Sequence, residues 1–132
     1  MKEEILKFFK GDIEDSDAVL TQYSTDASLF EIRPQLVLFP KDSEDIQNLV
    51  LWVKDHKAEY ADLSLTVRAA GTCMSGGPLN NSLIIDVMRY MSGIREIKRV
   101  APHTMMPKFP NANAVTITGE ATVEPGVFYR DF

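Results

Sequence analysis

The sequence has one cysteine, Cys73, in 132 residues, and it has neither a long apolar run nor a dense basic cluster. A single cysteine excludes an internal disulfide and a cysteine-based metal site within one chain. No segment approaches the roughly 18–20 consecutive apolar residues of a membrane-spanning helix. The first residues carry Glu3 and Glu4, and no secretory signal is recognisable there. We therefore expect a cytoplasmic protein in a reducing compartment, with no membrane partner.

Positive charge is also scarce. The chain has 14 Lys and Arg against 19 Asp and Glu, which gives a formal net charge of -5 at pH 7. A nucleic-acid surface needs clustered basic side chains that displace counterions, so no nucleic-acid partner is expected. His56 and His103 stand alone in the sequence, and we expect them to be solvated, with no metal site. The length and composition suit about one globular domain.

The first 32 residues predict a helical lead-in to the main domain. The apolar side chains Ile5, Leu6, Phe8 and Phe9 share one helical stripe, and Gly11 follows as a stop signal. A second helical turn is predicted over residues 17–23. The segment after it ends at Pro34, which restricts the preceding residue to extended geometry. Residues 33–132 are predicted to form the domain itself.

A strand, a helix and a second strand are predicted between residues 36 and 69. Residues 36–39 are a continuous apolar run that Pro40 closes, and residues 65–69 form another such run. Between them, apolar residues recur at the helical positions Ile46, Leu49, Val50 and Val53. This order predicts a β-α-β unit with parallel strands and a right-handed crossover, in an α+β fold.

The rest of the chain predicts shorter strands. Strands are expected over residues 83–86, 94–100 and 115–123, the last with the alternation of an exposed hairpin, and the proline-rich residues 101–114 are expected to be a surface loop. Asp86 ends the first of these strands, where it either caps the following turn or faces a ligand. Pro125 and Gly126 predict the start of a helix, and because the sequence stops soon after, a truncated domain.

The stretch VRAAGTCMSGGPLNNSL, residues 67–83, has the composition of a phosphate-binding loop. Glycines let several backbone N–H groups converge on an anion, and a loop after a parallel strand is placed to use them. A nucleotide-hydrolysing loop would need a lysine after Gly76, where Gly77 stands, and the G-x-G-x-x-G fingerprint is absent too. The loop therefore suits an intact diphosphate, with a tight structural connection as the alternative. Cys73 is either a redox thiol or a small buried loop residue.

Three segments in order resemble one known family. IRPQLVLFPKDSEDIQNLV, TVRAAGTCMSGGPLNNSLIIDVMRYM and ATVEPGV are similar to the FAD-binding domain of FAD-linked oxidoreductases, the PCMH-type or vanillyl-alcohol oxidase fold. Within the family they look most like the D-lactate and glycolate dehydrogenase branch. The resemblance runs from about residue 33 to residue 132, and it implies the N-terminal part of that domain, with a small parallel β-α-β sheet followed by antiparallel strands.

The resemblance also implies which residues bind FAD. The loop would surround the pyrophosphate with backbone amides, Pro40 would border the adenosine part, and the v-x-P-G motif would lie near the flavin. The residues that it places at the cofactor are Pro40, Arg68, Ala69, Ala70, Gly71, Thr72, Cys73, Met74, Ser75, Gly76, Gly77, Glu124, Pro125 and Gly126. Members that attach FAD covalently often carry a histidine where this chain has Thr72, so non-covalent binding is implied.

The family completes its FAD site with a second subdomain and binds substrate with a cap domain, and both are missing from this sequence. No catalytic base can therefore be named, and little catalysis is expected of the chain alone. Two other functions stay open. The chain could be a scaffold or interaction module that self-associates or pairs with the missing half of the enzyme, or it could bind another diphosphate ligand such as a nucleotide sugar or CoA.

Overall fold

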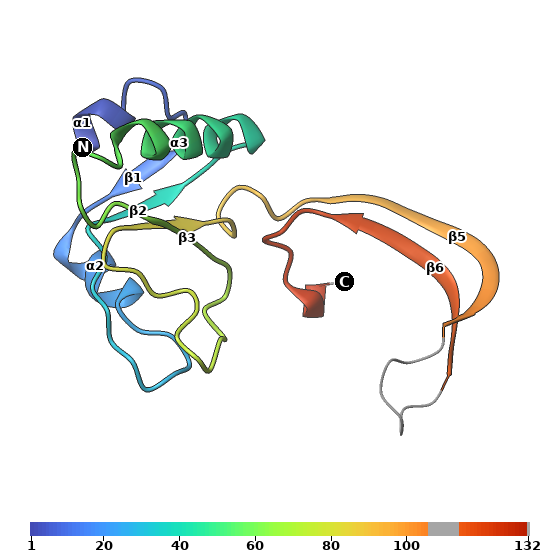
Figure 1. Ribbon diagram of the computed structural model, residues 1–132. Helices are drawn as coiled ribbons and strands as arrows, with labels where there is room; N and C mark the ends of the chain where they lie inside the picture. Colours follow the sequence, from blue (N-terminus) through green and yellow to red (C-terminus); the bar gives the residue numbers. More distant parts are fainter. Residues whose placement is uncertain (106–113, 132) are drawn as a thin grey trace.

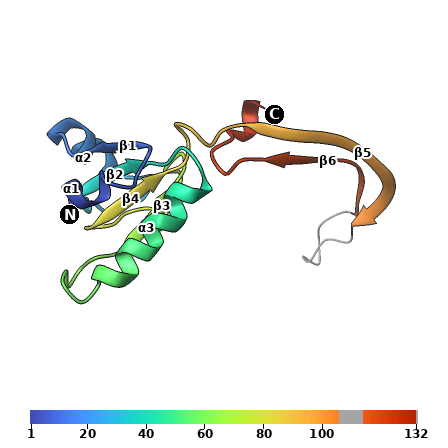
Figure 2. The ribbon, with the colours of Figure 1, turned by 90° about the horizontal axis from the view of Figure 1, so that it is seen from above.

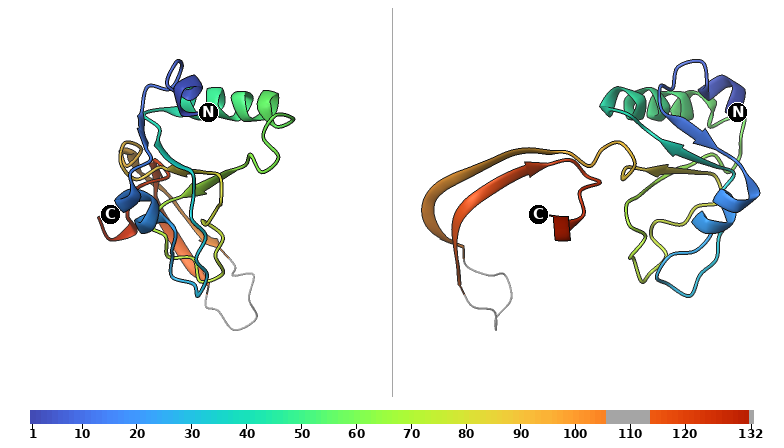
Figure 3. Two further views of the ribbon diagram at one scale, coloured as in Figure 1. Left: turned by 90° about the vertical axis from the view of Figure 1, so that its left-hand side faces the viewer. Right: turned by 180° about the vertical axis from the view of Figure 1, so that it is seen from behind.

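The computed structural model describes residues 1–105 and 114–131, and it shows two parts (Figure 1). The first is a four-stranded sheet in the order β1-β2-β4-β3 with short helices around it. The second is a two-stranded ribbon, β5-β6, that projects from one end of the sheet (Figures 1 and 3). The α+β class predicted from the sequence is confirmed. Within these residues, no helix is long and apolar enough to cross a membrane.

The two central strands are the apolar runs of the sequence. All four residues of β2 (Leu36–Phe39) and all four of β4 (Leu83–Asp86) are buried. The two strands pair in parallel, and β3 (Leu65–Arg68) pairs in parallel with the other side of β4. Continuous apolar runs are typical of parallel strands covered on both faces. The predicted parallel β-α-β unit is present, and β4 lies between its two strands.

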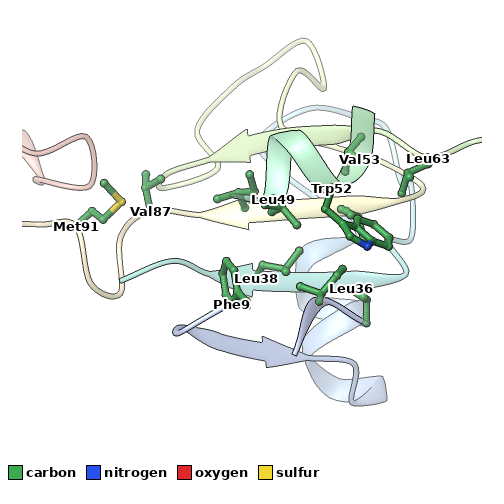
Figure 4. Close-up of a cluster of buried hydrophobic side chains, with 12 residues drawn as sticks. Phe9, Leu36, Leu38, Leu49, Trp52, Val53, Leu63, Val87 and Met91 are labelled. Carbon is green, nitrogen blue, oxygen red and sulfur yellow. The ribbon is translucent and has the colours of Figure 1, made fainter. Parts of the chain in front are cut away.

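Helix α3 (Ser43–His56) covers one face of the sheet (Figure 2). Its N-cap Asp42 accepts a hydrogen bond from the Asp45 N–H at 3.0 Å, as capping residues do. Leu49, Trp52 and Val53 of this helix pack on Leu36 and Leu38 of β2, together with Phe9 from the lead-in (Figure 4). This face holds the hydrophobic core.

The opposite face carries a different set of side chains. Helix α2 (Asp17–Tyr23) ends there, and the Tyr23 ring meets the Phe39 ring edge-on, with centroids 6.0 Å apart. Arg68 and Asp86 are register partners at the ends of β3 and β4, and they lie on this face as well. The Tyr23 hydroxyl donates to the Asp86 carboxylate at 2.8 Å. Polar contacts thus add to apolar packing on this face of the sheet.

The lead-in contributes a strand that the sequence did not predict. After the one-turn helix α1 (Lys2–Ile5), β1 (Asp12–Glu14) pairs antiparallel with β2. The predicted apolar stripe is only partly right, because Leu6 is 48% exposed while Ile5 and Phe9 are buried. The domain boundary at residue 33 stays a prediction, although the sheet draws on residues from both sides of it.

The ribbon pairs β5 (Ile94–Met105) with β6 (Val115–Val123) antiparallel, as the alternation of residues 115–123 predicted. The prediction of a surface loop from residue 101 is wrong up to Met105. The pairing shifts register between Arg99 and His103, and Pro102 lies in this irregularity, where its missing N–H removes no ladder bond. Residues 106–113 of the predicted loop lie outside the described residues.

The helix predicted to begin at Pro125 is also not observed. Residues 125 and 126 form a turn, and a 3₁₀ helix, η1 (Tyr129–Asp131), follows. Gly126 makes a close contact between chain segments here instead of starting a helix.

Candidate functional site

The predicted site residues gather mostly at one edge of the sheet. Strands β2, β3 and β4 run parallel, so their carboxyl ends lie together, and these ends are followed by Pro40, Ala69 and Val87. Ligands of open parallel sheets bind beyond the carboxyl ends of the strands. The glycine-rich loop, defined here as residues 69–77, leaves β3 at this edge.

Two glycines give the glycine-rich loop its shape. Gly71 has φ = 67° and Gly76 has φ = 75°, both in the left-handed region that glycine adopts without steric cost. A Cβ atom at Gly71 would lie 2.5 Å from Nη2 of Arg68, and one at Gly76 would lie 2.9 Å from Cδ2 of Phe30. The loop therefore needs glycine at both positions for its backbone conformation, whereas the Arg68 and Phe30 side chains could move to make space.

The glycine-rich loop borders an open hollow of about 290 Å³. The residues that line this hollow are Val67, Ala69, Ala70, Gly71, Thr72, Cys73, Gly77 and Pro78. Thr72 and Ser75 are exposed, so their hydroxyls are accessible to a ligand, and the Met74 side chain is 84% exposed. Most of the lining side chains are small, which lets a ligand approach the backbone.

The interior of the loop already favours negative charge. The Sγ of Cys73 lies 3.2 Å from the Ser75 hydroxyl oxygen. Hydrogen bonds from this hydroxyl, and then from the backbone of Ser75 and Gly77, hold the pKa of the Cys73 thiol below its usual value. These groups would stabilise a thiolate because they point hydrogen-bond donors at one place. Cys73 is half-buried, which leaves both the redox and the structural interpretation of the thiol open.

Arg68 directs its charge toward the lead-in. Its Nη1 donates to the backbone oxygen of Thr25 at 2.8 Å and to that of Tyr23 at 3.3 Å. Its guanidinium carbon lies 4.9 Å from the centroid of the Tyr23 ring, within the range of a cation–π interaction. The Ala27 N–H donates to the backbone oxygen of Gly71 at 3.0 Å. These contacts could not be predicted from the sequence, because most of them are made by backbone atoms of the lead-in.

Buried polar groups fix the segment that leads from the glycine-rich loop into β4. Asn80 is 7% exposed, and its amide donates to the Thr66 hydroxyl at 2.8 Å. Its side-chain oxygen accepts from the Ser82 N–H at 2.8 Å and from the Ser64 hydroxyl at 3.0 Å. Every polar atom of this side chain has a partner, so the chain re-enters the sheet in one register.

Asp86 caps a turn, one of the two roles that the sequence left open. One of its oxygens accepts from the Met88 N–H at 2.7 Å, and the other accepts from the Tyr23 hydroxyl. Burial, followed by the hydrogen bond to this carboxylate, raises the pKa of Tyr23. The tyrosine therefore remains a neutral donor, and Asp86 belongs to the framework beneath the loop.

The predicted residues Glu124, Pro125 and Gly126 stand at the junction of ribbon and sheet. Glu124 accepts from the Gly93 N–H at 2.9 Å and from Arg95 at 2.7 Å. The Gly126 N–H donates to the Met91 oxygen at 2.8 Å, and a Cβ there would overlap the backbone oxygen of Val87. These bonds tie the end of β6 to the turn after β4, and Figure 4 shows Val87 and Met91 at that end of the core.

A family model described as an FAD binding domain matches residues 34–132. The chain belongs to this family. The predicted resemblance is thus confirmed. The family is one of FAD-dependent oxidoreductases, so FAD is the cofactor to which the site has to be compared.

The relatives to which the chain is similar are named as dehydrogenases. The chain is 36% identical over 89 residues to D-2-hydroxyglutarate dehydrogenase of Haemophilus influenzae, which covers 67% of this chain and 8% of that protein. It is 35% identical to the enzyme of that name from Pantoea ananatis and 34% identical to that from Escherichia coli, over the same shares. The chain spans about 8% of the length of these relatives.

The residues present fit one part of FAD. Two glycines with positive φ and small lining residues leave the loop backbone open to an anionic group. Within the described residues no group of three or more His, Cys, Asp or Glu side chains could hold a metal ion. The loop backbone at this edge of the sheet can therefore accept an anionic group.

Proposed function

We propose that the glycine-rich loop binds the pyrophosphate of FAD through its backbone N–H groups. The observation that carries the proposal is the pair of positive-φ glycines, Gly71 and Gly76, in a loop that leaves the carboxyl end of a parallel strand. Thr72, Ser75 and the backbone of Gly77 would supply further donors. Pro40, which is buried where β2 ends, would border the adenosine part.

The cofactor would be held non-covalently. Position 72 carries threonine, where members of the family that attach FAD covalently often carry histidine. When bound, FAD would accept a hydride from a 2-hydroxy acid, the substrate class that the name of the relatives implies. The residues of this chain would bind and orient the cofactor, and the remainder of a full-length enzyme would supply the substrate-binding and acid–base groups. We place such an enzyme in the cytoplasm.

A titration with FAD tests this proposal. Flavin fluorescence is followed as the purified chain is added, and ADP and CoA are used as competitors. We expect FAD to bind and ADP to compete, because the two share the adenosine diphosphate. CoA should compete less well, because its ribose carries a 3′-phosphate and its diphosphate carries pantetheine in place of riboflavin. No response to FAD, together with binding of CoA, would refute the assignment.

The exposed ribbon favours a second role, as a surface for another chain. Ile97 of β5 is 72% exposed, and Met105 and Val115 are 57% and 58% exposed. A two-stranded ribbon alone is marginally stable in water, so a protein partner or a second copy would stabilise it. Sedimentation equilibrium distinguishes the two roles, since an interaction module self-associates or binds the rest of the enzyme even without FAD.

A further inference from the structure

The segment of residues 23–30, called here the brace, precedes the residues that the family model matches, yet it contacts the glycine-rich loop at two points and Arg68, the residue just before the loop, at a third. The backbone oxygens of Tyr23 and Thr25 accept hydrogen bonds from Arg68. The Ala27 N–H donates to the Gly71 oxygen at 3.0 Å. The Phe30 ring lies against Gly76, as the 2.9 Å from Cδ2 to a Cβ placed there shows. Both positive-φ glycines are thus contacted by the brace or by the arginine that it holds.

The brace is a folded unit with bonds of its own. The Asp26 carboxylate accepts from the Ser28 N–H at 2.8 Å, and the Ser28 hydroxyl accepts from the Phe30 N–H at 3.1 Å. Thr25 and Glu31 form an isolated antiparallel bridge, and the Ile32 N–H donates to the Ser24 oxygen at 2.8 Å. The turn is closed at its base, so its contacts with the loop are held in a fixed relation.

Tyr23 connects this unit to the sheet. Its hydroxyl donates a hydrogen bond to Asp86, and its ring packs edge-on against Phe39. The Arg68 guanidinium lies over the same ring. Arg68 in turn occupies the space that a side chain at Gly71 would need. A continuous series of contacts therefore runs from the end of β4 through Tyr23 and Arg68 to the first positive-φ glycine of the loop.

We propose that Tyr23 and Phe30 are positioning residues for the glycine-rich loop. They hold the loop in its binding conformation through Arg68 and Gly76 without themselves contacting the pyrophosphate. Preorganisation of this kind strengthens binding because less conformational freedom is lost when the ligand arrives. The inference rests on the proposed function for its ligand, while the effect on the loop is independent of any ligand.

The experiment compares Tyr23→Leu, Tyr23→Phe and Phe30→Ala with Tyr60→Leu as the matched control. Tyr60 is half-buried too, but it packs near Trp52, away from the loop, with ring centroids 6.3 Å apart. One readout is the FAD titration. The other is the rate at which Cys73, the only thiol of the chain, reacts with a disulfide reagent in the absence of FAD. This rate is measured at a pH at which the thiol is fully ionised in every variant, so that it reports access to the sulfur and not its ionisation. Circular dichroism confirms that each variant is folded.

Tyr23→Leu is expected to raise the thiol rate several-fold and to weaken FAD binding about tenfold, since it removes a cation–π contact and a hydrogen bond. Tyr23→Phe keeps the ring and should restore most of the affinity. Phe30→Ala should raise the rate of the Cys73 reaction. Because Phe30 is 59% exposed, this variant should fold, so the proposal can be tested even if Tyr23→Leu does not fold.

Wild-type thiol rates in Phe30→Ala and in folded Tyr23→Leu would overturn the proposal. An equal increase in Tyr60→Leu would overturn it as well, because the effect would then follow general destabilisation. If the wild-type chain does not bind FAD but the thiol rates change as expected, the positioning role stands and only the identity of the ligand is wrong.

Discussion

Replacing Gly76 by alanine tests whether backbone conformation at the loop determines cofactor affinity. At φ = 75° an L-residue is strained by roughly 1–2 kcal/mol. The added Cβ would also lie 2.9 Å from Cδ2 of Phe30, but this exposed ring can rotate away, so the overlap adds little. If the variant loop leaves the left-handed conformation, FAD has to restore it on binding. We therefore expect the dissociation constant for FAD to rise by about 5- to 30-fold.

Two further variants separate conformation from size. Gly76→Asn introduces a larger side chain, but asparagine tolerates positive φ better than alanine does, so Gly76→Asn should bind FAD more tightly than Gly76→Ala. Gly119→Ala is the matched control, since its Cβ would make an ordinary contact of 3.5 Å with the Lys98 oxygen and should leave affinity unchanged. Isothermal titration calorimetry or flavin fluorescence measures all three. If Gly76→Ala binds as tightly as the wild type, the reasoning fails.

Two more predictions concern the junction between ribbon and sheet. Gly126→Ala should destabilise the fold by about 2–3 kcal/mol, because the new methyl group would overlap backbone oxygens that cannot rotate away; urea denaturation measures this, and an unchanged midpoint would contradict it. The hydrogen bonds from Arg95 and from the Gly93 backbone lower the pKa of Glu124 below 4.5. The ionised Glu124 carboxylate therefore contributes fully to the free energy of unfolding above pH 4.5. This contribution is lost as the pH falls through the lower pKa of the folded state. Glu124→Gln should make the free energy of unfolding less dependent on pH in this range. If the pH dependence of the variant equals that of the wild type, the stabilising role of Glu124 is refuted.

The sequence predicts those elements whose signal is local. Strands β2 and β4 follow from continuous apolar runs, α3 follows from its spacing and its cap at Asp42, and the glycine-rich loop follows from glycines placed after a strand. Strand β1 has only three residues, one of them apolar, so it exists through its pairing with β2 and leaves no pattern. The extension of β5 past Val100 likewise depends on β6, which supplies partners on both sides of Pro102.

The candidate site divides in the same way. Gly71 and Gly76 could be singled out because glycines cluster after a predicted strand, and the structure shows both with positive φ; their role at the pyrophosphate stays a prediction. The brace could not be predicted, because the atoms with which it holds Arg68 are backbone oxygens that any residue type provides. Glu124 and Gly126 were expected near the flavin, and their described contacts fix the ribbon instead; a role at the flavin stays a prediction.

The strand order β1-β2-β4-β3 has a consequence for how the chain folds. Strand β2 lies early in the sequence, whereas its parallel partner β4 follows only after α3, β3 and the whole glycine-rich loop. Closing such a long-range pair costs chain entropy before it yields contacts, which slows folding. The stretch that leads from β3 back to β4 therefore sets the time at which the sheet can be completed. Sequence changes that tune this stretch for a ligand will also change the folding rate.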